Sequence, residues 1–304
     1  MSIITRTSTF AMHNNLLRNI NQSQARLFEA QDQLSSGLKS RNFAGFSGQV
    51  EQFVSLESKI KTVVTFQENN AVNVSRLETT KEALKQITDV VDQMEDLITL
   101  RRNPALANDI AFEQQMHALM RSVAAEMNTT FEGKYLFSGT KTNVPPIMDD
   151  PTVTKPVEVG VPDDGYYRGS KEDVIMRVDE NVDLRARVRG DHIGFQRVFA
   201  AAHQALEGHE NNKDDTLSAS LDLLQVGLKD IIAAEASVNA DILAINNISE
   251  RQNSLQLYWQ GVTEEVANTD VLAVSTKLAV DETILTASFQ AFASISQLRL
   301  SNFL

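Results

Sequence analysis

Cysteine is missing from the 304-residue chain, and its absence removes several kinds of chemistry at once. Disulfides, thiolate metal sites and thiol nucleophiles are all excluded. A chain without thiols also suits a polypeptide that crosses between compartments unfolded. The N-terminal segment lacks the apolar core and cleavage site of a secretory signal, and no apolar run approaches the roughly 18 residues of a membrane-spanning helix. We therefore expect neither signal-dependent secretion nor membrane insertion.

Positive charge is scarce as well. The chain has 28 Lys and Arg residues against 40 Asp and Glu, which gives a formal net charge of −12. Such a surface repels nucleic-acid phosphates and anionic lipid headgroups. Nucleic acid is therefore not expected as a partner.

Proline and glycine are rare except in one central segment. Five of the six prolines lie between Pro145 and Pro162, and seven of the thirteen glycines between Gly133 and Gly194. Both residue types break helices, and the same segment contains strand-like runs with alternating apolar residues. These runs are 135–137, 157–159, 174–178 and 184–189. The pattern predicts a small β-rich insert at 134–193.

Outside this insert, apolar residues recur at spacings of three and four, which is typical of one stripe on a long helix. The predicted fold class is mainly α: a long helical bundle or coiled-coil rod, formed with N- and C-terminal arms, carrying a small β-rich central insert. The predicted domains are an N-terminal arm, the first part of the rod, the insert, the second part of the rod and a C-terminal arm. Their residue ranges are 1–45, 46–133, 134–193, 194–260 and 261–304.

Local signals place the ends of the predicted helices. One helix is expected at about 50–102, and Asn103 with Pro104 would cap and start the next. After the insert, a helix is expected at about 213–259. Gly227 inside it costs roughly 1 kcal/mol relative to alanine. Gly261 is expected to act as a hinge before the C-terminal arm.

The two terminal arms each carry an apolar seam that neither can bury alone. Five of the seven N-terminal seam positions (17, 20, 24, 27, 31, 34 and 38) are apolar, and Gln24 and Gln31 are the polar exceptions. Residues 1–40 have four basic and two acidic side chains, a net of +2, whereas residues 263–304 have two basic and five acidic, a net of −3. Opposite charge favours association between the arms. We expect the arms to be poorly ordered in the monomer and to order on assembly.

The residues predicted to form the assembly interface are those of the two seams. Ordinary packing within one chain is the alternative reading of each of them. They are Leu17, Ile20, Leu27, Leu34, Val274, Leu278, Leu285, Phe292 and Ile295.

No pattern predicts a catalytic, cofactor-binding or metal site, so the chain is not expected to be an enzyme and no cofactor is expected. The segment His209–Lys213 has lysine where a zinc-protease helix needs its second histidine. The segment Gly160–Gly165 has phosphate-loop glycine spacing but lacks the lysine that follows in such loops. Three arginines at 185, 187 and 189 are expected on one face of a strand. In so acidic a chain this face is interpreted as a solvated strand surface. The alternative is that these arginines, with Tyr166 and Tyr167, contact a carbohydrate or host ligand.

Segments near both ends of the chain resemble the flagellin superfamily. Gln33-Leu-Ser-Ser-Gly-Leu-Lys39 is similar to the segment that closes the first helix in flagellins and their junction relatives. Ala267–Asp270, Gln290–Leu298 and Ser301–Leu304 look like the C-terminal run of the hook-filament junction family. Gly133–Thr142, at the entry to the insert, is similar to this junction family more than to flagellin. Arg41–Gly48 departs from the usual loop of the superfamily, which leaves the turn after the first helix undetermined.

This resemblance implies a structural subunit of the bacterial flagellum that serves motility at the hook-filament junction. Such a subunit is exported through the flagellar type III channel with an export chaperone, and folds beneath the filament cap. It forms a ring between the first hook-associated protein and flagellin, so all of these are expected partners. A minor flagellin that polymerises in the filament is the alternative.

Overall fold

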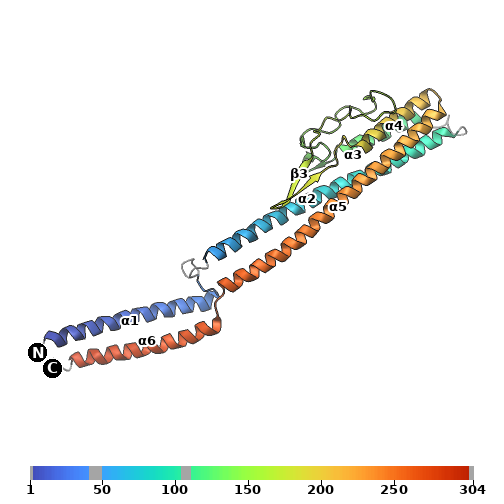
Figure 1. Ribbon diagram of the computed structural model, residues 1–304. Helices are drawn as coiled ribbons and strands as arrows, with labels where there is room; N and C mark the ends of the chain where they lie inside the picture. Colours follow the sequence, from blue (N-terminus) through green and yellow to red (C-terminus); the bar gives the residue numbers. More distant parts are fainter. Residues whose placement is uncertain (1–2, 41–49, 104–110, 301–304) are drawn as a thin grey trace. The chain divides into compact units, whose positions relative to one another are not determined.

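The computed structural model describes residues 3–40, 50–103 and 111–300, and the side chains of 11–40, 50–103 and 111–294. The chain divides into two compact units (Figure 1). Unit 1 contains residues 1–62 and 255–304, and unit 2 contains residues 63–254. The mainly α fold with a small β insert is confirmed.

Helices supply most of the described structure. Helix α2 matches the predicted helix at 50–102 closely, whereas the segment around Pro104 lies outside the described residues. The helices are α1 (Ile3–Ser36), α2 (Val50–Arg102), α3 (Phe112–Met127), α4 (Ile193–Glu210), α5 (Asp214–Ala267) and α6 (Val271–Leu300).

Unit 2 has a continuous apolar core built from α2, α3, α4, α5 and the insert. Its largest side chains are fully buried, and a methionine series at helical spacing fills the space where α2 meets α3. Methionine suits such a position because its flexible, unbranched side chain adapts to irregular gaps. The methionines are Met94, Met116, Met120 and Met127. All four are completely buried and serve core packing.

Glycine lets α4 and α5 approach each other closely. A Cβ at Gly227 would lie 3.0 Å from the Cβ of Arg197 and 3.1 Å from the carbonyl oxygen of Gly194. Glycine at position 227 costs some helix stability, but its lack of a Cβ allows the backbones of α4 and α5 to pack in contact. An ion pair between Arg197 and Asp230 joins the same two helices.

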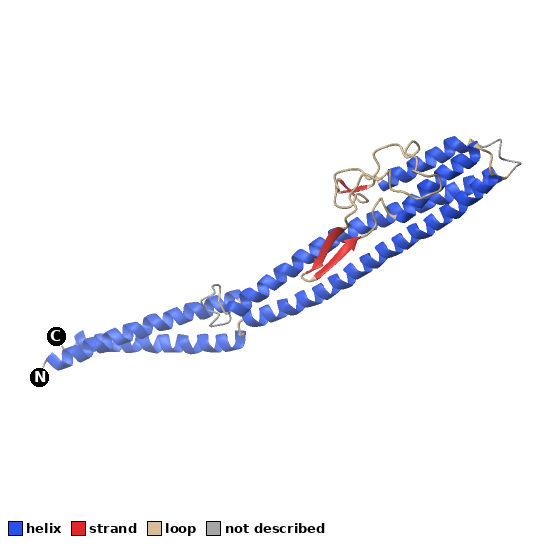
Figure 2. Cartoon of the chain, turned by 45° about the horizontal axis from the view of Figure 1, so that its top comes forward, coloured by secondary structure: helices blue, strands red, loops and turns tan. Residues whose placement is uncertain are grey.

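Two short antiparallel hairpins form the β structure of the insert (Figure 2). Strands β1 (Thr130–Phe131) and β2 (Lys134–Tyr135) are joined by Glu132 and Gly133, which both have positive φ, as a tight two-residue hairpin turn requires. Strands β3 (Val174–Asp179) and β4 (Val182–Ala186) form the second hairpin. The predicted run at 157–159 forms no strand, and Val157 is 98% exposed. Proline residues flank this run and leave it without a partner strand.

A buried amide pair holds the β3–β4 hairpin on the long helices. The side-chain nitrogens of Asn70 in α2 and Gln252 in α5 each donate to the carbonyl oxygen of Val178, at 3.0 Å in both cases. Both amide side chains are almost completely buried. The hairpin is thereby positioned by α2 and α5 together.

The predicted hinge at Gly261 is wrong. Helix α5 continues through Gly261 to Ala267, and the chain leaves helical structure only at Asn268–Asp270. One glycine in a helix of 54 residues costs roughly 1 kcal/mol, too little to end it. The first residues after the insert also form a helix of their own, α4, before the turn that starts α5.

Candidate assembly interface

In unit 1, α1 and α6 pack against each other along one seam. Its positions recur at spacings of three and four, as in a coiled coil. The seam consists of Ile20, Ser23, Leu27, Ala30 and Leu34 of α1 and Val274, Leu278, Asp281, Leu285 and Phe292 of α6.

Most of the predicted interface residues lie on this seam. Ile20 and Val274 are buried, whereas Leu17 is 37% exposed. Ile295 lies in α6, beyond the described side chains. The remaining five are half-buried along the seam: Leu27, Leu34, Leu278, Leu285 and Phe292. The structure thus brings the two predicted sets together within one chain, and their role between chains stays a prediction.

Two of the predicted α1 seam positions, 24 and 31, lie one residue beyond the positions that are buried, 23 and 30. Ser23 and Ala30 are each only 2% exposed, whereas Gln31, a predicted seam residue, is exposed. Small side chains at these positions let the helix backbones approach, which glutamine would prevent. The signal was present, because 20, 23, 27, 30 and 34 also follow the three-and-four spacing.

One ion pair interrupts the apolar seam. The Nε atom of Arg26 donates to Oδ1 of Asp281 at 3.1 Å, and its Nη2 donates to the Ser23 hydroxyl at 3.0 Å. Asp281 is 4% exposed, and its Oδ2 has no hydrogen-bond partner among the described residues. Such a pair adds little stability because the Asp281 carboxylate loses water while the Arg26 side chain stays 41% exposed, but it forms in only one helix register. The pair therefore favours one register of α1 against α6.

Large apolar side chains also point away from the seam. Phe28 of α1 is 69% exposed, and Leu272 and Phe289 of α6 are 79% and 47% exposed. Met12 and Val280 are also more than half exposed. These side chains leave apolar surface exposed on both helices of unit 1.

The end of α1 is joined to the start of α6 by backbone hydrogen bonds. Gly37 has φ +73° and its N–H donates to the carbonyl of Gln33 at 2.9 Å, an ending that glycine allows without strain. The next residue, Leu38, forms a β-bridge with Asn268. The Asp270 carboxylate then accepts from two backbone N–H groups and caps α6. The two sequence motifs 33–39 and 267–270 thus build one structure; the atypical turn at 41–48 lies outside the described residues.

The Lys39 side chain strengthens this junction. Its Nζ donates to the carbonyl oxygens of Glu265 at 3.2 Å and Val266 at 2.9 Å, near the C-terminal end of α5. A cation is favoured there because the last carbonyls of a helix lack helical partners. Lys39 therefore ties the end of α1 to the end of α5.

The segments that came closest to enzyme motifs have structural roles. Helix α4 ends at Glu210, and Asn212 has φ 50°, so His209–Lys213 is not a continuous helix. In the loop Gly160–Gly165, the Asp163 carboxylate accepts from the N–H of Gly165 at 3.0 Å, which makes the loop a turn. Within the described ranges, no three His, Cys, Asp or Glu side chains are placed to hold a metal ion.

The tyrosines proposed as ligand contacts are core residues instead. Tyr166 is 5% exposed and donates to the carbonyl of Gly190 at 2.8 Å; Tyr167 is 8% exposed and donates to the carbonyl of Ser170 at 2.9 Å. Burial raises the pKa of both phenols. The ligand-binding reading of these two residues is wrong, because their hydroxyl groups pair inside the insert.

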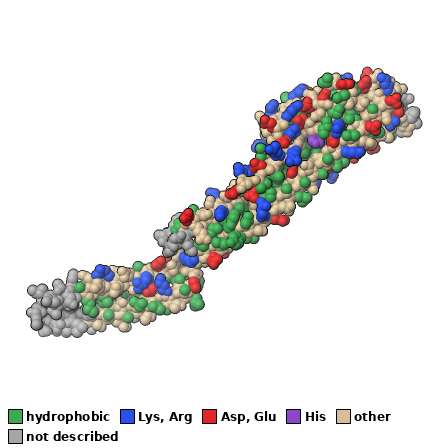
Figure 3. Space-filling model, in the orientation of Figure 1, with side chains coloured by type: hydrophobic (Ala, Val, Ile, Leu, Met, Phe, Trp, Pro, Cys, Tyr) green, Lys and Arg blue, Asp and Glu red, His purple; other side chains and the backbone are tan. Residues whose placement is uncertain are grey.

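The three arginines divide between surface and core. Arg185 and Arg187 are exposed at the β3–β4 hairpin, where Figure 3 shows Lys and Arg side chains gathered. Arg189 turns inward and pairs with Asp173 and Asp191. The period-two alternation ends with β4 at Ala186, so the predicted common face does not extend to residue 189.

Comparison with known proteins finds a family match in the first half of the chain. Residues 7–142 match the family model of the bacterial flagellin N-terminal helical region. This stretch contains most of α1, all of α2 and α3, and the β1–β2 hairpin. The N-terminal part of the chain is therefore similar to the helical region of flagellins.

The individual relatives are hook-associated proteins. The chain is 22% identical to Flagellar hook-associated protein 3 of Escherichia coli (strain K12) over 325 positions, covering 97% of this chain and 98% of that protein. Its fold is similar to the crystal structure of Bacillus cereus FlgL, with TM-score 0.57, 16% identity and coverage of 69% of this chain and 98% of that chain. A candidate flagellar hook-associated protein of Vibrio parahaemolyticus has TM-score 0.58 and 16% identity, covering 71% of this chain and 96% of that one. The resemblance predicted from the sequence motifs is confirmed.

None of the described helices has an apolar window long enough to cross a lipid bilayer.

Proposed function

We propose that this chain is a structural subunit of the bacterial flagellum that forms the junction between hook and filament, with no catalytic role. Its similarity to hook-associated protein 3 extends over 97% of the chain, and this observation carries the proposal. The geometry supports it, because α1 and α6 bury one seam and expose further apolar surface to neighbouring subunits.

Assembly by coupled folding accounts for this arrangement. The chain passes through the type III export channel unfolded, accompanied beforehand by an export chaperone, and its terminal helices order as they join the tubular wall. There it forms a ring with further copies, between the first hook-associated protein and flagellin. The predicted interface residues, such as Leu285 and Phe292, first pair the two arms and then position their outer faces against neighbours.

Deletion of the gene in the source bacterium tests the proposal. We expect electron microscopy to show hooks without filaments, and the medium to contain shed flagellin, because flagellin cannot attach without the junction. Complementation with the intact gene is the control. Intact filaments on the deletion strain would contradict the junction role.

The match to the flagellin N-terminal region also favours a second candidate, a minor flagellin. A filament protein polymerises on its own into long fibres, whereas a junction protein stops at short rings. Electron microscopy of the purified chain after seeding distinguishes the two functions. Long fibres would favour the minor flagellin.

A further inference from the structure

The outward face of α5 in unit 2 is apolar and almost uncharged. Its exposed side chains define the α5 stripe: Val226, Ile232, Ala233, Ala236, Ala240 and Leu243. Ile232 is 48% exposed and Leu243 is 56% exposed. Between positions 226 and 247, Lys229 is the one exposed charged residue of this helix.

The outward face of α2 has the opposite character. Exposed acidic side chains recur on it one or two turns apart. Loss of water and, after it, the neighbouring acids raise the pKa of Asp92. They are Glu78, Glu82, Asp89, Asp92 and Asp96. Against this acidic background, a face of α5 without negative charge is the part of the bundle best suited to contact another copy of the same acidic chain.

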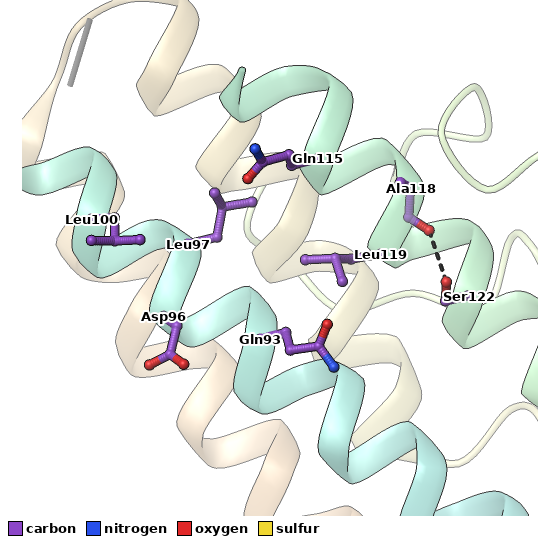
Figure 4. Close-up of a pocket in the computed structure, with 8 residues that line it drawn as sticks. All are labelled: Gln93, Asp96, Leu97, Leu100, Gln115, Ala118, Leu119 and Ser122. Carbon is purple, nitrogen blue, oxygen red and sulfur yellow. Dashed lines mark hydrogen bonds between the residues drawn. The ribbon is translucent and has the colours of Figure 1, made fainter. Parts of the chain in front are cut away.

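A groove of about 360 Å³ opens between α2 and α3 (Figure 4). Leu97, Leu100 and Leu119 form its apolar lining, and Leu100 is 43% exposed. The amides of Gln93 and Gln115 and the carboxylate of Asp96 also line it. The groove thus combines an apolar floor with one negative charge.

The groove and the α5 stripe lie on different sides of α2. Helix α5 is tied to α2 through hydrogen bonds from Gln225 to Glu95, at 2.8 Å, and from Lys81 to Asn239, at 3.1 Å. The groove lies where α2 meets α3, and none of its lining residues belongs to α5. One copy can therefore use both surfaces at the same time.

We propose that the α5 stripe of one copy docks into the α2–α3 groove of the next copy. Ile232 enters the apolar groove, and Lys229, one turn away on α5, pairs with Asp96 at its edge. Neither charge has an ion-pair partner within its own chain among the described residues. Alanines at 233, 236 and 240 allow the helices to approach closely. This inference rests on the proposed assembly function.

The contact is heterologous, because it joins two different surfaces. Repetition of such a contact produces a ring or a helix rather than a closed dimer. The α5 stripe and the α2–α3 groove would therefore supply the lateral contacts of a junction ring. This contact belongs to unit 2 and is separate from the seam of the terminal arms.

Cysteine cross-linking in assembled flagella tests the contact directly, since the natural chain has no cysteine. Ala118→Cys, at the groove, is combined with Ala233→Cys, on the stripe. We expect covalent oligomers after mild oxidation of flagella from complemented cells. The matched control combines Ala118→Cys with Val157→Cys on the exposed insert loop, and each single variant is a second control. Filaments that form normally without cross-links specific to the first pair would overturn the contact and leave the junction function intact.

Charge exchange provides the second test. Lys229→Glu and Asp96→Lys should each weaken self-association of the purified chain by about two- to fivefold, the usual range for a surface ion pair. The double variant should restore it. Sedimentation velocity measures the effect, and Glu250→Lys, at an exposed position beyond the stripe, is the control. If the two losses of self-association add up in the double variant instead of cancelling, the proposed ion pair is ruled out.

Discussion

Unit 2 and the helix pair of unit 1 bury their apolar side chains to very different degrees. Core residues of unit 2 such as Ile87, Met116 and Phe137 are fully buried. In the α1–α6 seam, Leu27 and Leu285 are only half-buried, and the charged pair of Arg26 and Asp281 lies among them. Unit 2 can therefore be stable alone, whereas the helix pair has apolar surface left over. The difference supports the proposal that the arms make contacts with other chains.

The largest expected effect comes from removing a core side chain of unit 2. Phe137→Ala should lower the free energy of unfolding by about 3–5 kcal/mol, because the ring is buried and packs at 5.9 Å between centroids against Phe195. Phe28→Ala, at a position 69% exposed on α1, should change it by less than about 0.5 kcal/mol. Denaturant unfolding of the monomer measures both. Similar losses of unfolding free energy in the two variants would contradict the difference in burial between unit 2 and the helix pair.

A charge in the seam should separate folding from assembly. In Leu285→Asp a half-buried carboxylate would replace an apolar contact in the α1–α6 seam, which should weaken the helix pair by about 1–3 kcal/mol. Unit 2 should unfold at an unchanged denaturant concentration, while incorporation into flagella is abolished. Immunoblots of sheared flagella measure incorporation, and Thr286→Asp at the exposed neighbouring position is the control. Normal incorporation of Leu285→Asp would remove this residue from the interface.

Removing the Arg26–Asp281 ion pair should have a smaller effect on the stability of the helix pair, and in the opposite direction. Asp281→Leu removes a buried carboxylate that has an unpaired oxygen, and the Arg26 charge is not left buried because that side chain is 41% exposed, so the helix pair should gain up to about 1 kcal/mol. Assembly should nevertheless become less efficient, because the Arg26–Asp281 pair no longer selects one register of α1 against α6. Hydrogen exchange of α6 amides and incorporation are measured together, with the exposed Glu282→Leu as the control. A less protected α6 in Asp281→Leu would show that the pair stabilises the helices instead.

The smallest expected effect is a pH dependence confined to unit 2. Burial lowers the pKa of His203, whose Nε2 lies 3.0 Å from the carbonyl oxygen of Pro151. The unfolded chain takes up the proton more readily, so stability is present above the ordinary histidine pKa of about 6.5 and is lost as the pH falls through the lowered value. Thermal unfolding should show a shallower pH dependence in His203→Gln than in the natural chain. An unchanged slope would exclude His203 as a cause.

Sequence periodicity predicted the long helices, the β insert and most seam residues, since each follows from local spacing of apolar residues. It placed Gln31 in the seam and missed Ala30, because an alanine carries little hydrophobic signal although it decides how closely the helices approach. The sequence also left Tyr166 and Tyr167 open as candidates for ligand contacts, since burial of an aromatic pair depends on the partners Gly190 and Ser170, which no local pattern identifies. A tertiary partner likewise explains why Gly227 matters, since it packs against Arg197 and Gly194 of α4.

Hydrogen exchange measured on the dilute monomer and on the assembled protein tests the central claim most directly. The account predicts that amides of α1 and α6 exchange much faster than those of the unit 2 core in the monomer, and become protected on assembly. Equal protection of the arms and the unit 2 core in the dilute monomer would contradict it, because the arms would then be complete without partner chains.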